Sequence, residues 1–415
     1  YKNEHNTYFF KEFNIESRFN RDIRYIDISS PDIIQGSMSG RFSFNDLKKL
    51  FENSLGNIYA NYIPHKVKEN QKIDFNFRIY NKILEVFMPD IELGANTFVR
   101  GSVESDEKEF RLTFKSPKIK LNNNFIQNIE LQVDNSNPLF NTYVEVDSIK
   151  TDYYDVSRFS LINATINDTL FMRSEFKGGK RNKDNYNLSF YHTINEDNES
   201  VIGFKKSDVV IKDYNWAINE VDDKFNKIAF NKDLSKFNID KLRINHNNEE
   251  IKLSGFINGK TQKDLKLNFT NIDLSKITPD IDSLSLGGNV NGKLDILQKN
   301  GSYLPNSTVV IDDFEINDFP LGSFDATITG NEDLTNYNVD VFIKDDISKS
   351  FSAKGDISVV GRLSNIDVDL DFDRFNLVPL NPLLEDVLSD IRGKVSGTAR
   401  VHGNLKKPDI DGELK

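Results

Sequence analysis

A short pattern of alternating glycine and apolar residues recurs along this chain and constrains its fold more than any other feature. It occurs at residues 36–42, 288–294 and 393–399. Because side chains alternate across a β-strand, the glycines and apolar residues of each copy face one side, and small or charged residues face the other. The pattern therefore predicts strands with one apolar face and one solvated face.

Two longer segments, each ending in one of the last two copies of this pattern, repeat along the chain. Internal repetition favours an elongated, self-stacking architecture over a compact enzyme fold. A more degenerate third copy has Phe98, Gly101 and Val103 ahead of an apolar run at residues 110–114. In the two clear copies, Ile251, Leu253, Gly255, Ile257, Leu265, Leu267, Phe269 and Pro279 correspond to Phe351, Ala353, Gly355, Ile357, Val368, Leu370, Phe372 and Pro382.

Runs with an apolar residue at every second position dominate the chain, as in residues 73–79, 110–114 and 339–343. Such alternation is typical of antiparallel strands with one buried or ligand-covered face, and Asn, Asp and Gly between the runs supply turns. We therefore predict a mainly β fold of about thirty short strands. The expected architecture is an elongated, curled antiparallel sheet that forms an open groove, or β-taco, with a few short amphipathic helices.

Helical spacing is confined to three short stretches, residues 44–51, 83–93 and 377–388, and Pro89 interrupts the second of them. We expect the last of these helices, residues 377–388, to pack on the apolar face or to close its edge. The polar, Asn-rich residues 181–198 predict a long hairpin tip. The chain is expected to contain three successive parts: residues 1–80, a β segment with a short helix; residues 81–246, a middle groove segment; and residues 247–415, a two-unit repeat that continues the groove.

The composition excludes several classes of protein. Only 38% of the residues are hydrophobic and 28% are charged, so much of the chain faces water. A net charge of −11 argues against a nucleic-acid surface, and the absence of cysteine excludes disulfides and thiolate zinc sites. No apolar run reaches the length of a membrane span, and the first residues lack the organisation of a signal peptide. We expect the chain to be an excerpt of a longer protein whose membrane anchor lies elsewhere.

A ladder of four aspartates, Asp367, Asp369, Asp371 and Asp373, partly resembles the acidic start of a calcium-binding loop. However, Phe372 stands where such a loop needs glycine, and apolar residues alternate with the aspartates as in a strand. We therefore predict a solvated outer face at this ladder, with weak calcium binding as the alternative.

No motif in the sequence points to catalysis. A G-x-S-x-G motif is absent, and residues 178–180 lack the remaining elements of a phosphate-binding loop. The histidines have no metal-binding spacing, so each is expected in a loop or on the surface. We predict that the protein is not an enzyme and binds no metal or other cofactor. The five histidines are His5, His65, His192, His246 and His402.

A large antiparallel sheet must cover its apolar face, by forming a sandwich, a barrel or a solenoid, or by curling into an apolar channel. Glycines that recur on the apolar face leave space for a foreign chain or a sharp bend, which favours a channel, although any single glycine serves equally well to relieve twist. We predict a groove lined by Val290, Leu294, Ile296, Phe324, Ala326, Ile328, Val339, Val341, Ile343, Ile366, Val368, Leu370, Phe372, Val395, Ala399 and Val401.

Three stretches of sequence resemble a known family. Residues 391–414 are similar to the repeated signature of TamB proteins, which belong to the AsmA-like superfamily of bridge-like lipid-transfer proteins. Residues 310–322, and residues 201–207 followed by residues 216–219, are similar to the Bacteroidota branch of that family. The resemblance extends over most of the chain and is clearest from about Val201 onward.

The resemblance implies a periplasmic protein, tethered to the inner membrane, whose groove conducts phospholipid acyl chains toward the outer membrane. It also implies a TamA-like outer-membrane barrel as partner. We expect the regions that contact this barrel, like the membrane anchor, to have no counterpart in this sequence. One alternative is a chaperone or scaffold that pairs its strand edges with outer-membrane proteins during their assembly. Another is an adhesin-like surface protein with a closed solenoid. Nucleic acid is not an expected partner.

Overall fold

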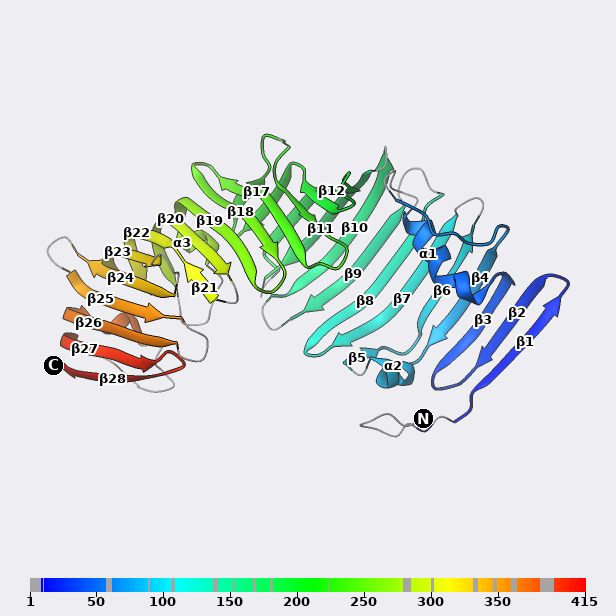
Figure 1. Cartoon of the computed structure of the whole chain (residues 1–415), viewed down its shortest axis with the longest axis horizontal. Coiled ribbons are helices and arrows are strands. Elements are labelled where there is room, and N and C mark those ends of the chain that lie inside the picture. Colours follow the sequence, from blue (N-terminus) through cyan, green and yellow to red (C-terminus); the bar gives the residue numbers. More distant parts are fainter. Residues whose placement is uncertain are drawn as a thin grey trace. The chain divides into compact units, whose positions relative to one another are not determined.

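The chain divides into two compact parts, unit 1 (Tyr1–Asp213) and unit 2 (Tyr214–Lys415). The structure is a computed structural model (Figure 1). The residues that it describes are 9, 11–56, 62–88, 90–105, 109–136, 141–151, 154–166, 169–179, 182–222, 224–278, 285–299, 302–330, 335–345, 349–359, 364–380 and 392–415.

Unit 1 is an antiparallel sheet in which most strands pair with the next strand along the chain (Figure 1). The short β5 departs from this order, because β4 pairs directly with β6 and β5 pairs with the far half of β7. The strands are β1 (Asn14–Asn20), β2 (Ile23–Ser29), β3 (Ile34–Arg41), β4 (Lys72–Ile79), β5 (Ile91–Leu93), β6 (Thr97–Glu104), β7 (Phe110–Leu121), β8 (Asn124–Asp134), β9 (Thr142–Lys150), β10 (Val156–Ile166), β11 (Thr169–Gly178), β12 (Asp184–Ile194), β13 (Ser200–Phe204) and β14 (Ser207–Ile211).

Unit 2 is also an antiparallel sheet with mostly sequential pairing. Its longest strand, β20, pairs with β19 on one side and with both β21 and β22 on the other. The strands are β15 (Tyr214–Ile218), β16 (Lys227–Phe230), β17 (Lys236–His246), β18 (Glu249–Asn258), β19 (Gln262–Asp273), β20 (Leu286–Lys299), β21 (Ser302–Pro305), β22 (Ser307–Ile316), β23 (Phe319–Gly330), β24 (Asn336–Lys344), β25 (Lys349–Ser358), β26 (Asn365–Asn376), β27 (Lys394–Asn404) and β28 (Lys407–Leu414). The mainly β, antiparallel prediction is confirmed.

The described helices are short. The predicted helix at residues 44–51 is confirmed, whereas the prediction for residues 83–93 is wrong after Phe87, because β5 follows there. Most of the predicted helix at residues 377–388 lies outside the described residues. The predicted hairpin tip at residues 181–198 is wrong, because β12 occupies most of it. The helices are η1 (Phe44–Asp46), α1 (Leu47–Gly56), α2 (Asn81–Phe87), α3 (Leu274–Ile277) and η3 (Val378–Leu380).

The sheet of unit 2 curls about its apolar side. Phe314 on β22 and Phe375 on β26 belong to one buried cluster. In a flat sheet, strands four positions apart would be separated by roughly 19 Å at about 4.8 Å per strand. Just beyond the ends of these strands, the side-chain amide of Asn317 lies 3.5 Å from the carbonyl oxygen of Pro379. The sheet must therefore bend strongly to bring the two sides together.

In unit 1, helix α1 covers part of the apolar face. Leu50 is 2% exposed and packs in a buried cluster with Val103 and Phe110. The ring of Phe51 lies 5.9 Å from the rings of Phe75 and Phe110. Burying each of these large side chains contributes about 1.5–3 kcal/mol, so α1 is held to the sheet mainly by its apolar residues.

The repeat predicted from the sequence has the same strand register in both copies. Copy A is β18 to β20 and copy B is β25 to β27. Phe269 in copy A pairs with Ile251 and Gly292. Its counterpart Phe372 in copy B pairs with Phe351 and Gly397. The matching residues Pro279 and Pro382 lie outside the described residues. In the degenerate third copy, Gly101 and Val103 face the apolar side but Phe98, one residue out of phase, faces the polar side.

Candidate functional site

The sixteen residues predicted to line a groove share one face of unit 2. Cross-strand partners lie on the same side of a sheet, so the register alone shows this. For example, Val341 on β24 stands opposite Ala326 on β23. Through Ala353 on β25 the same row reaches Leu370 on β26 and Ala399 on β27.

This apolar face is only partly covered. Of the sixteen side chains, six are buried, eight are half-buried and two are exposed, namely Leu294 at 37% and Ile296 at 47%. The buried six are Val290, Val339, Ile343, Val368, Val395 and Ala399. The half-buried eight are Phe324, Ala326, Ile328, Val341, Ile366, Leu370, Phe372 and Val401.

One end of the face is covered by short helical turns. Leu274 of α3 and Leu377, which precedes η3, pack against the cluster that contains Ile343 and Phe375. At the opposite end the exposure varies, because Ile296 is 47% exposed whereas Tyr337 is 1% exposed. The helical turns therefore cover one end of the apolar face, and the other end is covered unevenly.

Most of the recurring glycines do not leave space on this face, Gly393 being the exception, since nothing lies within 4 Å of a Cβ added there. A Cβ atom at Gly292 would lie 2.1 Å from the carbonyl oxygen of Thr308, and one at Gly397 would lie 2.1 Å from that of Glu413. Both glycines have a positive φ, 135° and 136°, which other residues rarely adopt. The glycines thus permit close approach of the neighbouring strand, and the interpretation that they make room for a foreign chain is wrong.

Unit 1 carries a comparable apolar face that the predicted groove residues did not include. Ile26, Met38 and Phe75 form one row of it, on β2, β3 and β4. Farther along, Asn163 and Ser174 are 5% and 3% exposed on the same face. The side-chain oxygens of these two residues have no hydrogen-bond partner in the described part of the chain. This face is therefore apolar with isolated polar positions.

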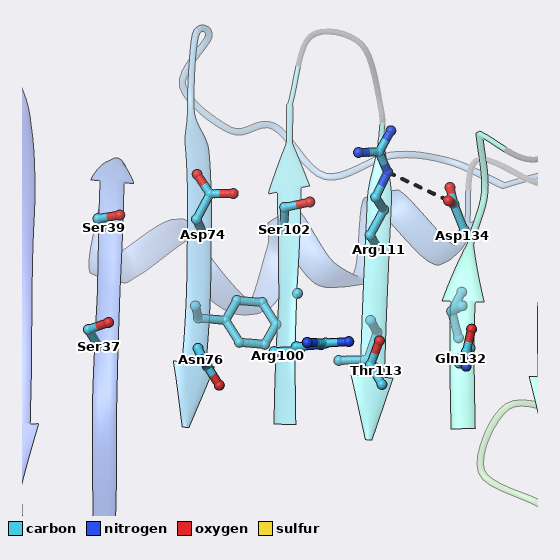
Figure 2. Close-up of a pocket in the computed structure, with 14 residues that line it drawn as sticks. Ser37, Ser39, Asp74, Asn76, Arg100, Ser102, Arg111, Thr113, Gln132 and Asp134 are labelled. Atoms are coloured by element: carbon cyan, nitrogen blue, oxygen red, sulfur yellow. Dashed lines mark ion pairs between the residues drawn. The ribbon is translucent and has the colours of Figure 1, made fainter. Parts of the chain in front are cut away.

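The opposite face of unit 1 is polar and carries a shallow hollow of about 490 Å³ (Figure 2). Two rungs of side chains cross β3, β4, β6, β7 and β8 there. Within the first rung, the Nε of Arg111 lies 3.6 Å from a carboxylate oxygen of Asp134. The first rung is Ser39, Asp74, Ser102, Arg111 and Asp134, and the second is Ser37, Asn76, Arg100, Thr113 and Gln132.

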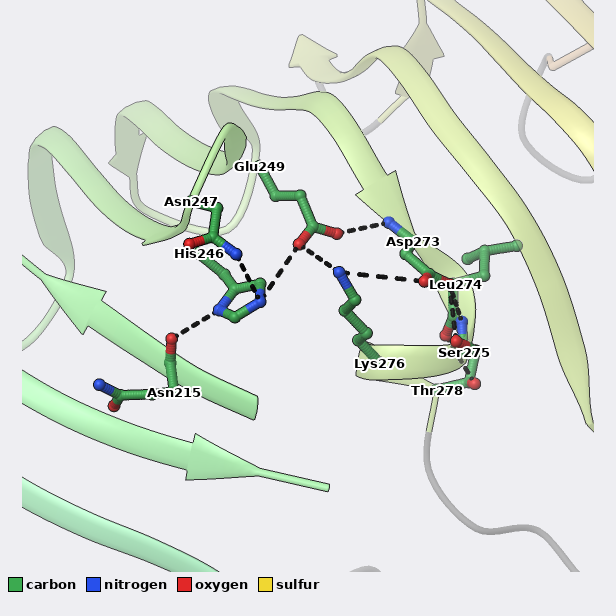
Figure 3. A network of polar contacts seen from close by, with 9 residues as sticks. All are labelled: Asn215, His246, Asn247, Glu249, Asp273, Leu274, Ser275, Lys276 and Thr278. Atoms are coloured by element: carbon green, nitrogen blue, oxygen red, sulfur yellow. Dashed lines mark hydrogen bonds and ion pairs between the residues drawn. The ribbon is translucent and has the colours of Figure 1, made fainter. Parts of the chain in front are cut away.

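A buried polar network joins β17, β18, β19 and α3 in unit 2 (Figure 3). Glu249, 4% exposed, accepts hydrogen bonds from the Lys276 ammonium at 2.7 Å and the Asp273 backbone N–H at 2.8 Å. The carboxylate of Glu249 raises the pKa of Lys276. His246 lies 3.8 Å from the same carboxylate, and its Nδ1 is 2.7 Å from the Asn215 carbonyl oxygen.

The histidine predictions are wrong at two positions. His246 stands on a strand with a side chain only 15% exposed. His192 is half-buried on β12, and burial lowers its pKa. His65 and His402 follow the prediction more closely, because each is partly exposed beside a carboxylate, Glu52 and Asp411 respectively. His5 lies outside the described residues.

The aspartate ladder of β26 faces solvent, as predicted. Asp367, Asp369, Asp371 and Asp373 are all exposed. Arg400 of the neighbouring strand donates two hydrogen bonds to Asp367, each of 2.7 Å, and thereby lowers the pKa of that carboxyl group. Among the described residues, no cluster of acidic or histidine side chains is arranged to hold a metal ion.

The described residues thus form a β-rich protein built on extensive antiparallel sheet with one apolar face. Residues 224–415, which lie in unit 2, match the family model described as TamB, N-terminal domain. This part of the chain is therefore a TamB-family domain. No curated protein and no solved structure matches it. None of the helices formed by the described residues is long and apolar enough to cross a membrane.

Proposed function

We propose that the apolar faces of this TamB-family chain conduct phospholipid between the inner and outer membranes. The chain would act in the periplasm, tethered to the inner membrane and engaged with a TamA-like outer-membrane barrel. The observation that carries the proposal is the single face shared by all sixteen predicted residues, ten of which remain half-buried or exposed.

The physical argument rests on the cost of exposing acyl chains to water. Each methylene moved from hydrocarbon into water costs about 0.8 kcal/mol, so a bare chain faces a steep barrier. Rows of Val, Ile, Leu and Phe side chains on adjacent strands would replace most of the lost hydrocarbon contacts. Because the face needs continuity rather than a closed pocket, conduction requires no catalytic group.

Adding a charge to this face tests the proposal. Val341→Arg would place a guanidinium among apolar neighbours on β23 and β25, and we expect it to reduce lipid transfer between donor and acceptor vesicles at least tenfold. Thr327→Arg on the adjacent strand adds the same charge to the polar face, since Thr327 pairs with Asp340 there. That control should transfer lipid normally. Equal transfer by both variants, at equal protein levels, would contradict conduction along this face.

Strand-edge pairing is the second candidate function. Within the described residues, β1 pairs only with β2, and all seven of its residues are exposed. Such an edge presents unpaired backbone groups that could recruit a strand of another protein. Photocrosslinkers at Glu16, which pairs with Asp27 on the polar face of this edge, would capture outer-membrane proteins if chaperoning is the main role, whereas conduction predicts lipid adducts from Val341 instead.

A further inference from the structure

Arg24 stands at an unusual position on the apolar face of unit 1. It pairs with Phe19 on β1 and with Gly40 on β3. Gly40 in turn pairs with Ile73, one of the residues buried beneath α1. This row therefore runs from the exposed strand β1 into the apolar core, and Arg24 places a cation where the next row carries Ile, Met and Phe.

Two aromatic rings flank the guanidinium of Arg24. Its central carbon lies 4.6 Å from the ring centre of Phe19 and 5.2 Å from that of Phe44. Both rings are largely exposed, at 61% and 55%. Cation–π contacts of this kind orient an arginine and supply about 0.5–1 kcal/mol each at exposed sites. They do not neutralise its charge.

Arg24 has no anionic partner in the described part of the chain. It forms no ion pair there, and its Nε is buried without a hydrogen-bond partner. Other cations of the same strands do have partners: Arg18 lies 3.5 Å from Asp27, and Arg41 pairs with Asp22. In a chain with 64 acidic and 53 basic residues, a cation left without a carboxylate is unexpected.

We propose that Arg24, between Phe19 and Phe44, binds the phosphate of a lipid headgroup whose acyl chains lie on the exposed apolar side chains of β1. This inference rests on the proposed function. A guanidinium offers a planar fork of donors that matches two phosphate oxygens, and an anion would satisfy the buried Nε. Gly40 adds no side chain beside Arg24, while Phe19 and, farther along the same face, the 56% exposed Ile15 offer apolar contacts for the chains.

The ligand chemistry is therefore a phosphate diester joined to an apolar tail. Inorganic phosphate supplies the first part only, and a diacylglycerol supplies the second part only. A lipid that carries both would contact the cation and the exposed apolar side chains of β1 together, so its affinity should exceed that of either component. This distinguishes a headgroup site from a general anion site.

Binding of short-chain lipids to the full chain, measured by calorimetry below their micelle concentration, tests the proposal. Wild type should bind dihexanoylphosphatidylglycerol more tightly than dihexanoylglycerol. Arg24→Gln should weaken the first affinity about tenfold, as expected for loss of a charge-assisted hydrogen bond, and leave the second unchanged. Arg18→Gln removes one charge from the polar face of the same hairpin and should alter neither affinity.

Thermal unfolding of each variant checks that it is folded. Should Arg24→Gln unfold, Arg24→Lys, which keeps the charge but loses the fork, is expected to lose anionic lipid affinity to a smaller degree. Equal binding of both lipids by wild type and the Arg24 variants would overturn this inference and leave the proposed function intact. Inorganic phosphate binding as tightly as the lipid would also overturn it. Failure of wild type to bind either lipid would overturn both.

Discussion

Copy A and copy B of the unit 2 repeat share a backbone but differ in what stabilises them. Each has a strand that ends in a bulge, a short helical turn and then a glycine-containing strand. The bulge residues Asn271 and Arg374 both have a positive φ, 51° and 52°. Their backbone N–H groups donate to equivalent side chains, Asn291 and Ser396, each at 2.8 Å.

The difference lies in the contacts of the helical turn. In copy A, Lys276 of α3 forms the buried ion pair with Glu249. In copy B the position of Lys276 is taken by Pro379, which is buried. The position of Glu249 is taken by Lys349, which is exposed. Both turns also pack an equivalent leucine, Leu274 in copy A and Leu377 in copy B, against one apolar cluster, so copy B has this packing without the ion pair. The backbone of the repeat is thus specified by bulge, cap and glycine, and the interior around the turn can be polar or apolar.

The largest expected effect concerns the shared glycines. Gly292→Ala and Gly397→Ala should each lower the free energy of unfolding by more than about 4 kcal/mol, because the new Cβ would meet a backbone carbonyl oxygen. Gly393→Ala is the control: φ is 105° there, but nothing lies within 4 Å of the added atom, so a loss of about 1–2 kcal/mol is expected. Urea unfolding measures all three. If alanine were tolerated at Gly292 but not at Gly397, or the reverse, the two copies would not be equivalent at this position.

The ion pair should matter in copy A only. Lys276→Met leaves the buried Glu249 without its cation, and we expect a loss of about 3 kcal/mol. Lys349→Met, at the position that corresponds to Glu249, removes only an exposed contact with the ring of Phe342 and should cost at most about 1 kcal/mol. Equal losses would show that the two turns are stabilised in the same way.

The side chains that accept a hydrogen bond from each bulge should make similar, smaller contributions to stability in both copies. Asn291→Ala and Ser396→Ala each remove one hydrogen bond to the bulge N–H, and we expect each to lower the free energy of unfolding by about 1 kcal/mol. Urea unfolding of the two single variants and the double variant would test this, with additive losses expected for separate sites. A negligible loss in one copy would mean that its bulge does not depend on the cap.

The smallest expected effect is a pH dependence confined to copy A. The pKa of Lys276 is raised in the folded state, so the pair with Glu249 contributes fully below the pKa of an unfolded lysine, about 10.4. Its contribution falls as pH rises through the raised folded-state value. The stability difference between wild type and Lys276→Met should therefore shrink above about pH 10.5. A difference that stays constant to pH 12 would contradict the assigned ion pair.

The strand faces of unit 2 could be predicted from the sequence because alternation is a local rule. Val341 and Leu370 alternate with aspartates, and one buried face fixes which way each side chain points. The same rule could have located Arg24, which is in phase with Ile26 and Ile28. Its missing carboxylate partner could not be predicted, because that depends on which residues of other strands come close.

Other features depended on pairing between distant residues. Residues 184–194 do carry an alternation, with Tyr186, Leu188, Phe190 and Ile194 in phase, but the asparagines around them also indicate turns, and pairing with β11 decides in favour of the strand β12. His246 lacks a sequence motif, and its burial follows from its position between Asn215 and Glu249. The role of the glycines also could not be predicted locally, because the backbone carbonyl oxygen that leaves no space for a Cβ belongs to the neighbouring strand.

Site-specific photocrosslinking in living cells tests the central claim most directly. Crosslinkers at Val341 and Leu370 report on the apolar face, and crosslinkers at Asp340 and Asp371, their neighbours in sequence, report on the polar face of the same strands. Lipid conduction predicts phospholipid adducts, identified by mass spectrometry, at the first two positions and none at the last two. Equal adduct yields on both faces, or none on the apolar face of a folded protein, would contradict it.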